Sequence, residues 1–216
     1  MKKKKKKLII WGATGQAVVL EEFLSKDYSI KILVDNNKKI KSPFKNVKLI
    51  YGKKEFEEWF KNKKGQYYSI AAIGGNGKDR VSVSKYLIKN NLKVISAINK
   101  KTNIASNALL GEGVQIFMNV TIGAKCNVGD YVILNHSASI DHHCVIEEGV
   151  HIAPGAKLAG NITIGRFSFV GTGAIILPNI TIGKECVIGA GSVVTKNIPN
   201  FSLAYGNPAK IKDIKI

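Results

Sequence analysis

The chain has 216 residues, enough for one large domain or two modest domains that each bury a core. It carries 33 Lys and Arg against 15 Asp and Glu, a formal net charge of +18, and almost all of the excess is Lys. Because no zinc-finger, helix-turn-helix or aromatic–basic motif accompanies this charge, it favours small phosphate-bearing ligands over nucleic acid.

The N-terminal lysine run resembles a secretory signal only superficially. Lys2–Lys7 precedes the apolar stretch Leu8–Trp11, but that stretch ends at Gly12 and no A-x-A-like cleavage site follows. No apolar run approaches the length of a membrane span. We expect a cytoplasmic protein that does not insert into membranes and whose three cysteines stay reduced.

Strands that alternate with helices predict a small parallel α/β sheet over residues 1–98. Short apolar runs indicate strands at 7–12, 29–34, 47–51, 67–73 and 93–97. Apolar residues at helical spacing indicate helices between them, at 16–26, 53–62 and 78–89.

A glycine-containing turn from Gly12 to Gly15 lies between the first strand and the first helix. Such a turn directs backbone N–H groups and a helix N-terminus toward a phosphate. Asp35 and Gly74-Gly75-Asn76 follow two further strands, and the carboxyl ends of parallel strands share one edge of a sheet. The G-x-x-G spacing matches a dinucleotide fingerprint only in part, so we predict a Rossmann-like domain for a mononucleotide or nucleotide sugar. The alternative is an ordinary βα turn without a ligand.

Ile, Leu or Val occupies every sixth position from Ile104 to Val194, sixteen times in succession. A period of six fits neither a strand nor a helix and is typical of parallel β-helices built from hexapeptide repeats. Three hexads make one triangular coil of about 18 residues, with the aliphatic side chains inward. We predict a β-helix domain over residues 99–216, in which the segment after Val194 covers the last coil. Four residues after each aliphatic residue the repeat has a small or β-branched residue. The three cysteines occupy this position and are expected in the core: Cys126, Cys144 and Cys186.

All four histidines lie close together in the repeat: His136, His142, His143 and His151. Because Ile140 points inward, His142 falls near a corner, and Gly160 follows it by one coil, roughly 4.8 Å away. A histidine that titrates near neutral pH suits a general base, and a backbone N–H at Gly160 would stabilise an oxyanion. Two alternatives remain, a zinc site built from the clustered histidines and polar surface histidines without a role.

Together these motifs resemble the bacterial nucleotide-sugar acetyltransferases of the left-handed β-helix (hexapeptide) superfamily. In particular, the chain is similar to the bacillosamine- and perosamine-pathway N-acetyltransferases and to the sialic acid O-acetyltransferases. The resemblance spans the whole chain and is carried by the segments 12–15, 35–36, 73–76, 141–144, 151–155, 159–161 and 206–210.

The resemblance implies an acyltransferase that moves an acetyl group from acetyl-CoA to the 4-amino group of a UDP-, dTDP- or GDP-linked amino-deoxy sugar, for polysaccharide biosynthesis. It also implies a left-handed β-helix, a homotrimer with active sites between neighbouring β-helices, and no metal. The alternatives are O-acetylation of a sialic acid or another sugar, and a non-catalytic trimer that binds nucleotide sugars.

Carried onto this sequence, the family pattern makes His142 the general base, with Asn135 orienting its imidazole and the Gly160 backbone at the thioester. The residues expected to bind acetyl-CoA are His151, Gly160, Gly173, Gly191, Asn207, Pro208, Ala209 and Lys210. Those expected to bind the nucleotide sugar are Gly12, Thr14, Gly15, Gln16, Asp35, Asn36, Gly74 and Asn76. Two positions depart from the pattern: relatives often have an acidic residue in place of His143 and a histidine in place of Gln16.

Overall fold

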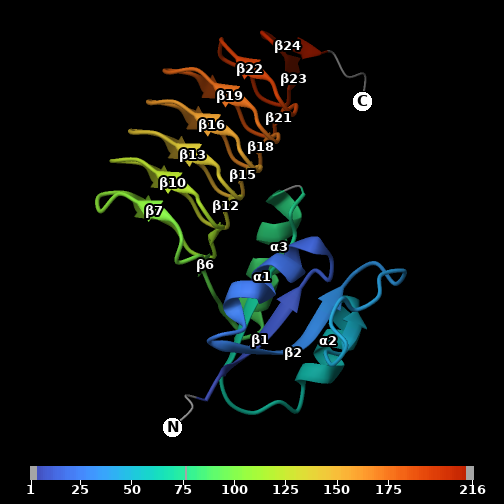
Figure 1. Ribbon diagram of the computed structural model, residues 1–216. Helices are drawn as coiled ribbons and strands as arrows, with labels where there is room; N and C mark the ends of the chain where they lie inside the picture. Colours follow the sequence, from blue (N-terminus) through green and yellow to red (C-terminus); the bar gives the residue numbers. More distant parts are fainter. Residues whose placement is uncertain (1–3, 76, 213–216) are drawn as a thin grey trace. The chain divides into compact units, whose positions relative to one another are not determined.

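The computed structural model describes residues 4–75 and 77–212, which divide into two compact units (Figure 1). One unit takes in Met1–Ile73 and Asp79–Ile95, and the other takes in Gly74–Lys78 and Ser96–Ile216. A single cut at residue 98 does not describe this division, because Gly74–Lys78 groups with the second unit. None of the helices in the described ranges has the length and apolarity that crossing a bilayer requires.

The first unit contains a five-stranded parallel sheet in the order β3-β2-β1-β4-β5. Its strands are β1 (Lys6–Trp11), β2 (Tyr28–Asp35), β3 (Leu49–Tyr51), β4 (Tyr67–Ala71) and β5 (Lys93–Val94). The helices that alternate with them are α1 (Gly15–Leu24), α2 (Gly52–Phe60) and α3 (Gly77–Lys89). This confirms the expected parallel α/β sheet, although its last strand is shorter than expected because Ala97 pairs within the second unit.

β1 is apolar throughout its buried part, as expected of a central parallel strand covered on both faces. Trp11 packs edge-on against Phe56 and Tyr86, with ring centroids 5.4 and 5.5 Å apart. The strand ends at Gly12, whose φ of +108° lies in the region that favours glycine. A Cβ at this position would lie 2.8 Å from the carbonyl carbon of Ala72, so the turn after β1 accepts no side chain.

The second unit is a parallel β-helix with three flat faces (Figure 1). From β6 to β19 each strand pairs with the strand one coil of three hexads further along, as in the pair Thr121–Ser139, which confirms the predicted coil. The first face consists of β6 (Ala97–Ile98), β9 (Gln115–Ile116), β12 (Ile133–Leu134), β15 (His151–Ile152), β18 (Phe169–Val170) and β21 (Val187–Ile188). The second consists of β7 (Asn103–Ile104), β10 (Thr121–Ile122), β13 (Ser139–Ile140), β16 (Lys157–Leu158), β19 (Ile175–Ile176) and β22 (Val193–Val194). The third consists of β8 (Leu109–Leu110), β11 (Asn127–Val128), β14 (Val145–Ile146), β17 (Thr163–Ile164) and β20 (Thr181–Ile182).

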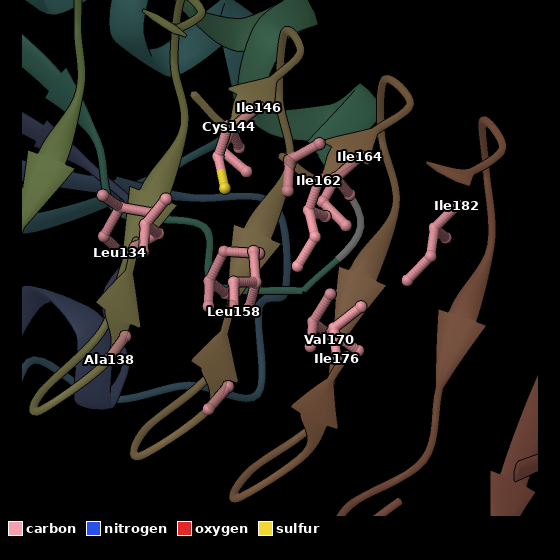
Figure 2. Close-up of a cluster of buried hydrophobic side chains, with 14 of the residues drawn as sticks. Leu134, Ala138, Cys144, Ile146, Leu158, Ile162, Ile164, Val170, Ile176 and Ile182 are labelled. Atoms are coloured by element: carbon pink, nitrogen blue, oxygen red, sulfur yellow. The ribbon is translucent and has the colours of Figure 1, made fainter. Parts of the chain in front are cut away.

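The core of the β-helix is a column of aliphatic side chains contributed by all three faces (Figure 2). Leu158 and Ile164 come from consecutive faces of one coil, and Ile176 and Ile182 repeat them one coil later. The three cysteines are buried free thiols in this column, so their expected role as core residues is confirmed.

Three corners connect the faces, and each turns through a residue in the left-handed conformation. The first corner joins the first face to the second, the second corner joins the second face to the third, and the third corner joins the third face to the next coil. In the coil 133–150 the left-handed residues are Ser137, His143 and Gly149, with φ of 58°, 56° and 69°. Residues that follow one another at intervals of one coil therefore line up along a corner.

The segment after the repeat covers the last coil, as expected. β23 (Leu203–Gly206) extends the first face by pairing with β21, and β24 (Ala209–Lys212) returns antiparallel to it. The turn between them contains a cis peptide bond at Asn207–Pro208.

Candidate active site

The second corner brings His142 and Gly160 together. His142 is exposed in the loop between β13 and β14, and Gly160 occupies the same corner one coil later. A Cβ built on Gly160 would lie 2.5 Å from Nε2 of His142. The imidazole therefore lies directly over the glycine backbone, and the structure places these two residues as the sequence predicts.

The backbone of Gly160 presents an unused hydrogen-bond donor beside this imidazole. Its carbonyl accepts a hydrogen bond from the Asn179 N–H at 3.1 Å. Its own N–H donates to no residue in the ranges 4–75 and 77–212, although Gly160 is buried. A buried N–H without a partner is rare in folded proteins and is available to a substrate oxygen.

A second histidine is hydrogen-bonded to His142. Nδ1 of His142 lies 3.0 Å from Nδ1 of His143, so one of the two nitrogens donates and the other accepts. The carboxylate of Asp141 accepts the backbone N–H of His142 at 2.7 Å. The imidazole of His142 is thus paired with a neighbouring ring.

The remaining two histidines form a separate polar chain at the first corner. Asn135 Oδ1 accepts hydrogen bonds from the backbone N–H and from Nδ1 of His136, at 2.8 and 2.9 Å. Asn135 Nδ2 lies 3.4 Å from Nε2 of the buried His151, whose Nδ1 is hydrogen-bonded to the carbonyl of Gly74. Asn135 therefore does not contact His142 of the same chain, and the orientation of His142 by Asn135 stays a prediction. Asn135 lies at a different corner, where its amide is held by His136 and His151.

The two groups of histidines lie far apart in a single chain. Residues 135 and 142 lie at successive corners of the coil, with the second face between them. Of the residues expected at the thioester, His142 contacts Gly160 at the second corner. His151 lies at the first corner, where it contacts Asn135.

Glycines form an open strip along the first corner above His136. Gly155, Gly173 and Gly191 succeed one another at intervals of one coil, with φ of 69°, 66° and 65°. A Cβ on any of them would meet no atom within 4 Å. The strip leads toward the turn between β23 and β24, where the Gly206 N–H donates to Ser192 Oγ at 3.2 Å. The expected acetyl-CoA residues other than His151 and Gly160 thus lie along one corner and at its end.

In the first unit, the glycine turn after β1 leads into an open helix terminus. Thr14 is the N-cap of α1 without a side-chain capping bond, and a Cβ built on Gly15 would meet no atom within 4 Å. Both oxygens of Asp35 accept backbone N–H groups, Oδ2 from Ala13 at 2.8 Å and Oδ1 from Asn37 at 2.9 Å. Asp35 therefore ties the turn after β1 to the turn after β2.

The other expected nucleotide-sugar residues are more scattered. Gln16 lies in the first turn of α1, and Asn36 is exposed beside Asp35. Gly74 belongs to the second unit, where its carbonyl holds His151. Asn76 lies outside the described residues.

Comparison with known proteins gives the family. A model of the bacterial transferase hexapeptide (six repeats) matches residues 143–177 and 161–196. A GDP-perosamine N-acetyltransferase from Escherichia coli O157:H7 is 31% identical over 99 residues, which cover 46% of this chain and 44% of that protein. A crystal structure of a histidine mutant of GDP-perosamine N-acetyltransferase from Caulobacter crescentus, in complex with CoA and GDP-perosamine, is 30% identical with a TM-score of 0.85, covering 96% of this chain and 97% of that one. The acetyltransferase domain of PglB from Neisseria gonorrhoeae FA1090, in complex with acetyl coenzyme A, is 27% identical with a TM-score of 0.84, covering 97% of this chain and all of that one.

The chain belongs to the nucleotide-sugar N-acetyltransferases of the hexapeptide superfamily.

Membership of these nucleotide-sugar N-acetyltransferases confirms the resemblance and the left-handed β-helix that it implied. These relatives are acetyltransferases whose structures contain CoA or acetyl-CoA. Within the described ranges no group of three or more His, Cys, Asp or Glu residues is arranged to hold a metal ion.

Sequence reasoning missed three features of this N-acetyltransferase. Gly155 belongs to the open strip with Gly173 and Gly191, and the interval of one coil would have found it. His136 stacks on Phe117 and is hydrogen-bonded to Asn135, and nothing in the sequence distinguishes its ring from other surface histidines. Arg80 is fully buried in the first unit, with Nη1 donating to the Ile73 carbonyl at 2.7 Å, and loss of hydration lowers its pKa to about 10.

Proposed function

We propose that this protein transfers the acetyl group of acetyl-CoA to the 4-amino group of a nucleotide-linked amino-deoxy sugar. The observation that carries the proposal is the placement of His142 over the Gly160 N–H, which has no partner among the described residues. It is supported by the match along nearly the whole chain to an N-acetyltransferase whose structure contains CoA and GDP-perosamine.

The chemistry needs a base and an oxyanion donor on one side of the thioester. As the sugar amine attacks the thioester carbonyl carbon, Nε2 of His142 takes a proton from the nitrogen. The developing oxyanion accepts a hydrogen bond from the Gly160 N–H, which is already in place and needs no reorganisation. Collapse of the tetrahedral intermediate forms the amide and breaks the carbon–sulfur bond, and the proton held by His142 passes to the departing CoA thiolate.

This mechanism requires one particular tautomer of His142. For Nε2 to accept a proton, the hydrogen of the neutral ring must be on Nδ1, which then donates to Nδ1 of His143. His143, in the left-handed position of the corner, is thereby the acceptor that holds the base in its working form.

Acetyl-CoA lies along the first corner in this proposal. The glycines of the strip leave the backbone open to a ligand, and the turn 207–210 stands at its end with the exposed cation Lys210. A lysine-rich chain of net charge +18 favours the approach of two polyanionic substrates.

The nucleotide sugar binds a Rossmann-like first unit in this proposal. The strand order β3-β2-β1-β4-β5 reverses direction beside β1, and ligands of such sheets bind where the order reverses. The turn Gly12–Gly15 and the N-terminus of α1, which has no side-chain cap, provide backbone donors for a phosphate at that position.

We further propose a homotrimer. His142 and the glycine strip lie at different corners of one chain, with the second face between them, so a thioester carried on the strip does not meet His142 of the same chain. If the second corner of one β-helix faces the first corner of its neighbour, each base meets a bound acetyl-CoA. We place the enzyme in the cytoplasm, where it would prepare a sugar for polysaccharide biosynthesis.

The test is a thiol-release assay with acetyl-CoA and a panel of UDP-, dTDP- and GDP-linked 4-amino-4,6-dideoxy sugars. We expect turnover with one nucleotide class and a product that mass spectrometry identifies as the N-acetyl sugar. The His142→Ala variant serves as the control and should lose about 10²–10⁴ in rate. Acetyl-CoA binding without turnover on any member of the panel would contradict the proposal and favour a non-catalytic role.

A further inference from the structure

In the hydrogen-bonded chain His136–Asn135–His151 at the first corner, two backbone groups determine which atoms donate and which accept. A backbone N–H can only donate, so the Asn135 atom that meets the N–H of His136 must be its oxygen. The Asn135 amide nitrogen then faces His151 Nε2, which must accept. The proton of the neutral His151 ring is consequently on Nδ1, where it is donated to the Gly74 carbonyl, a group that can only accept.

The same argument assigns the tautomer of His136. Asn135 Oδ1 is an acceptor, so Nδ1 of His136 carries a hydrogen and donates it at 2.9 Å. The lone pair of the neutral ring is therefore on Nε2, which has no hydrogen-bond partner among residues 4–75 and 77–212. The buried ring of Phe117 stacks on the imidazole at a centroid distance of 5.2 Å and an angle of 25°, which fixes the plane of the ring.

The position of His136 connects this acceptor with the glycine strip. The His136 carbonyl accepts the Gly155 N–H at 2.9 Å, so His136 lies directly below the first glycine of the strip. His136 and His142 belong to the same coil, whereas the turn 207–210 lies beyond Gly191 at the far end. An acetyl-CoA laid along the strip with its thioester at the level of His142 has the sulfur end of its pantetheine arm beside His136.

We propose that His136 binds acetyl-CoA, with Nε2 accepting a hydrogen bond from the pantetheine amide N–H that is nearest the thioester. Asn135 and His151 are positioning residues in this arrangement, because they hold His136 in the Nδ1–H form and leave Nε2 as an acceptor. The inference deepens the proposed function and depends on acetyl-CoA lying along the first corner.

The test combines a variant of the protein with a variant of the ligand. His136→Phe keeps a ring to stack on Phe117 and removes the acceptor nitrogen. We expect it to weaken acetyl-CoA about 3- to 10-fold in calorimetry, the effect of one neutral hydrogen bond, and to leave the KM for the nucleotide sugar unchanged. An acetyl-CoA analogue with an ester in place of that amide should bind the unaltered protein more weakly by a similar factor, and should lose nothing further in His136→Phe.

The positioning role has its own spectroscopic test. In long-range ¹H–¹⁵N spectra of the unaltered protein, His136 should show the Nδ1–H tautomer, which Asn135→Ala should convert to a mixture. Asn135→Asp retains an acceptor for His136 and should restore the Nδ1–H form.

The outcomes separate this inference from the proposed function. If the unaltered protein binds acetyl-CoA and both His136→Phe and the ester analogue leave the affinity unchanged, the inference about His136 is overturned alone. If the unaltered protein does not bind acetyl-CoA, the proposed function fails together with it. An Nε2–H tautomer of His136 would overturn the inference whatever the binding data show, including in the case that His136→Phe does not fold.

Discussion

The contact between His142 and Gly160 predicts a large effect from one added methyl group. In Gly160→Ala the Cβ would lie 2.5 Å from Nε2 of His142, whereas ordinary contacts of a Cβ begin at 3.4 Å. The φ of Gly160 is not among the left-handed values, so Ala fits the backbone and the strain falls on the imidazole, which must move by about 1 Å. A displacement of about 1 Å at a catalytic group costs on the order of 10²-fold in rate.

The assay is kcat/KM for the nucleotide sugar at saturating acetyl-CoA, measured by thiol release. We expect Gly160→Ala to lose about 10²-fold while its urea midpoint stays close to that of the unaltered protein, because His142 is exposed and free to swing away. The decisive control is the double variant. In the His142→Ala background the added methyl group has no ring to displace, so Gly160→Ala should lower the rate little further. Near-normal turnover of Gly160→Ala, or losses that multiply in the double variant, would refute the argument that the two residues act as a pair.

Three other substitutions test the histidine pair, the turn after β1 and a buried thiol. His143→Ala removes the acceptor of the His142 ring and should lower kcat about 3- to 10-fold at unchanged KM values. His143→Asn suits the left-handed backbone and can accept the same hydrogen, so it should recover most of the lost rate. Equal rates for the two variants would remove His143 from the mechanism. Gly12→Ala should destabilise the first unit by about 3 kcal/mol or more in urea unfolding, because the added Cβ would collide with the Ala72 backbone and the residue has a φ of +108°. The same variant should lose nucleotide-sugar binding, while calorimetry still detects binding of acetyl-CoA. Burial raises the pKa of the Cys186 thiol, so the contribution of this thiol to stability is complete below the unfolded pKa of about 8.5 and is lost as the pH rises through the folded pKa. The urea midpoint should therefore fall more steeply above about pH 8.5 in the unaltered protein than in Cys186→Ala. Parallel curves for the two proteins would contradict this.

The regular parts of the structure could be predicted because they repeat a local rule. Each hexad directs inward one aliphatic residue and the small residue four positions after it, and this pattern places Cys126, Cys144 and Cys186 in the core. The same rule places Gly160 over His142, since residues one coil apart occupy the same corner. The strands and helices of the first unit could be predicted from the alternation of strand and helix patterns, with errors of a few residues at their ends.

The polar contacts could not be predicted in the same way, because they depend on side-chain directions across a corner. Asn135 and His142 are close in the sequence, and the family pattern pairs them. The corner at Ser137 and the second face place them on different edges of the coil. The partner that Asn135 does meet, His151, follows it by almost one full coil, which returns the chain nearly to the same place.

The sites proposed to carry the chemistry are those where the repeat is least regular. An inward hexad position accepts many aliphatic residues at little cost, so it contains no information about function. At the second corner, by contrast, a glycine leaves room for an imidazole and keeps its N–H without a partner among the described residues, which no requirement of folding explains. At the first corner, three successive glycines in left-handed positions leave the backbone uncovered where the same conformation elsewhere in the β-helix accepts Asn, Ser or even Phe, as at Phe167. The backbone geometry therefore does not require glycine at these three positions, and the open surface is the more direct reason for it. A single chain presents His142 on one edge and the open strip on another, and the proposed trimer would join two such edges so that both features serve one reaction.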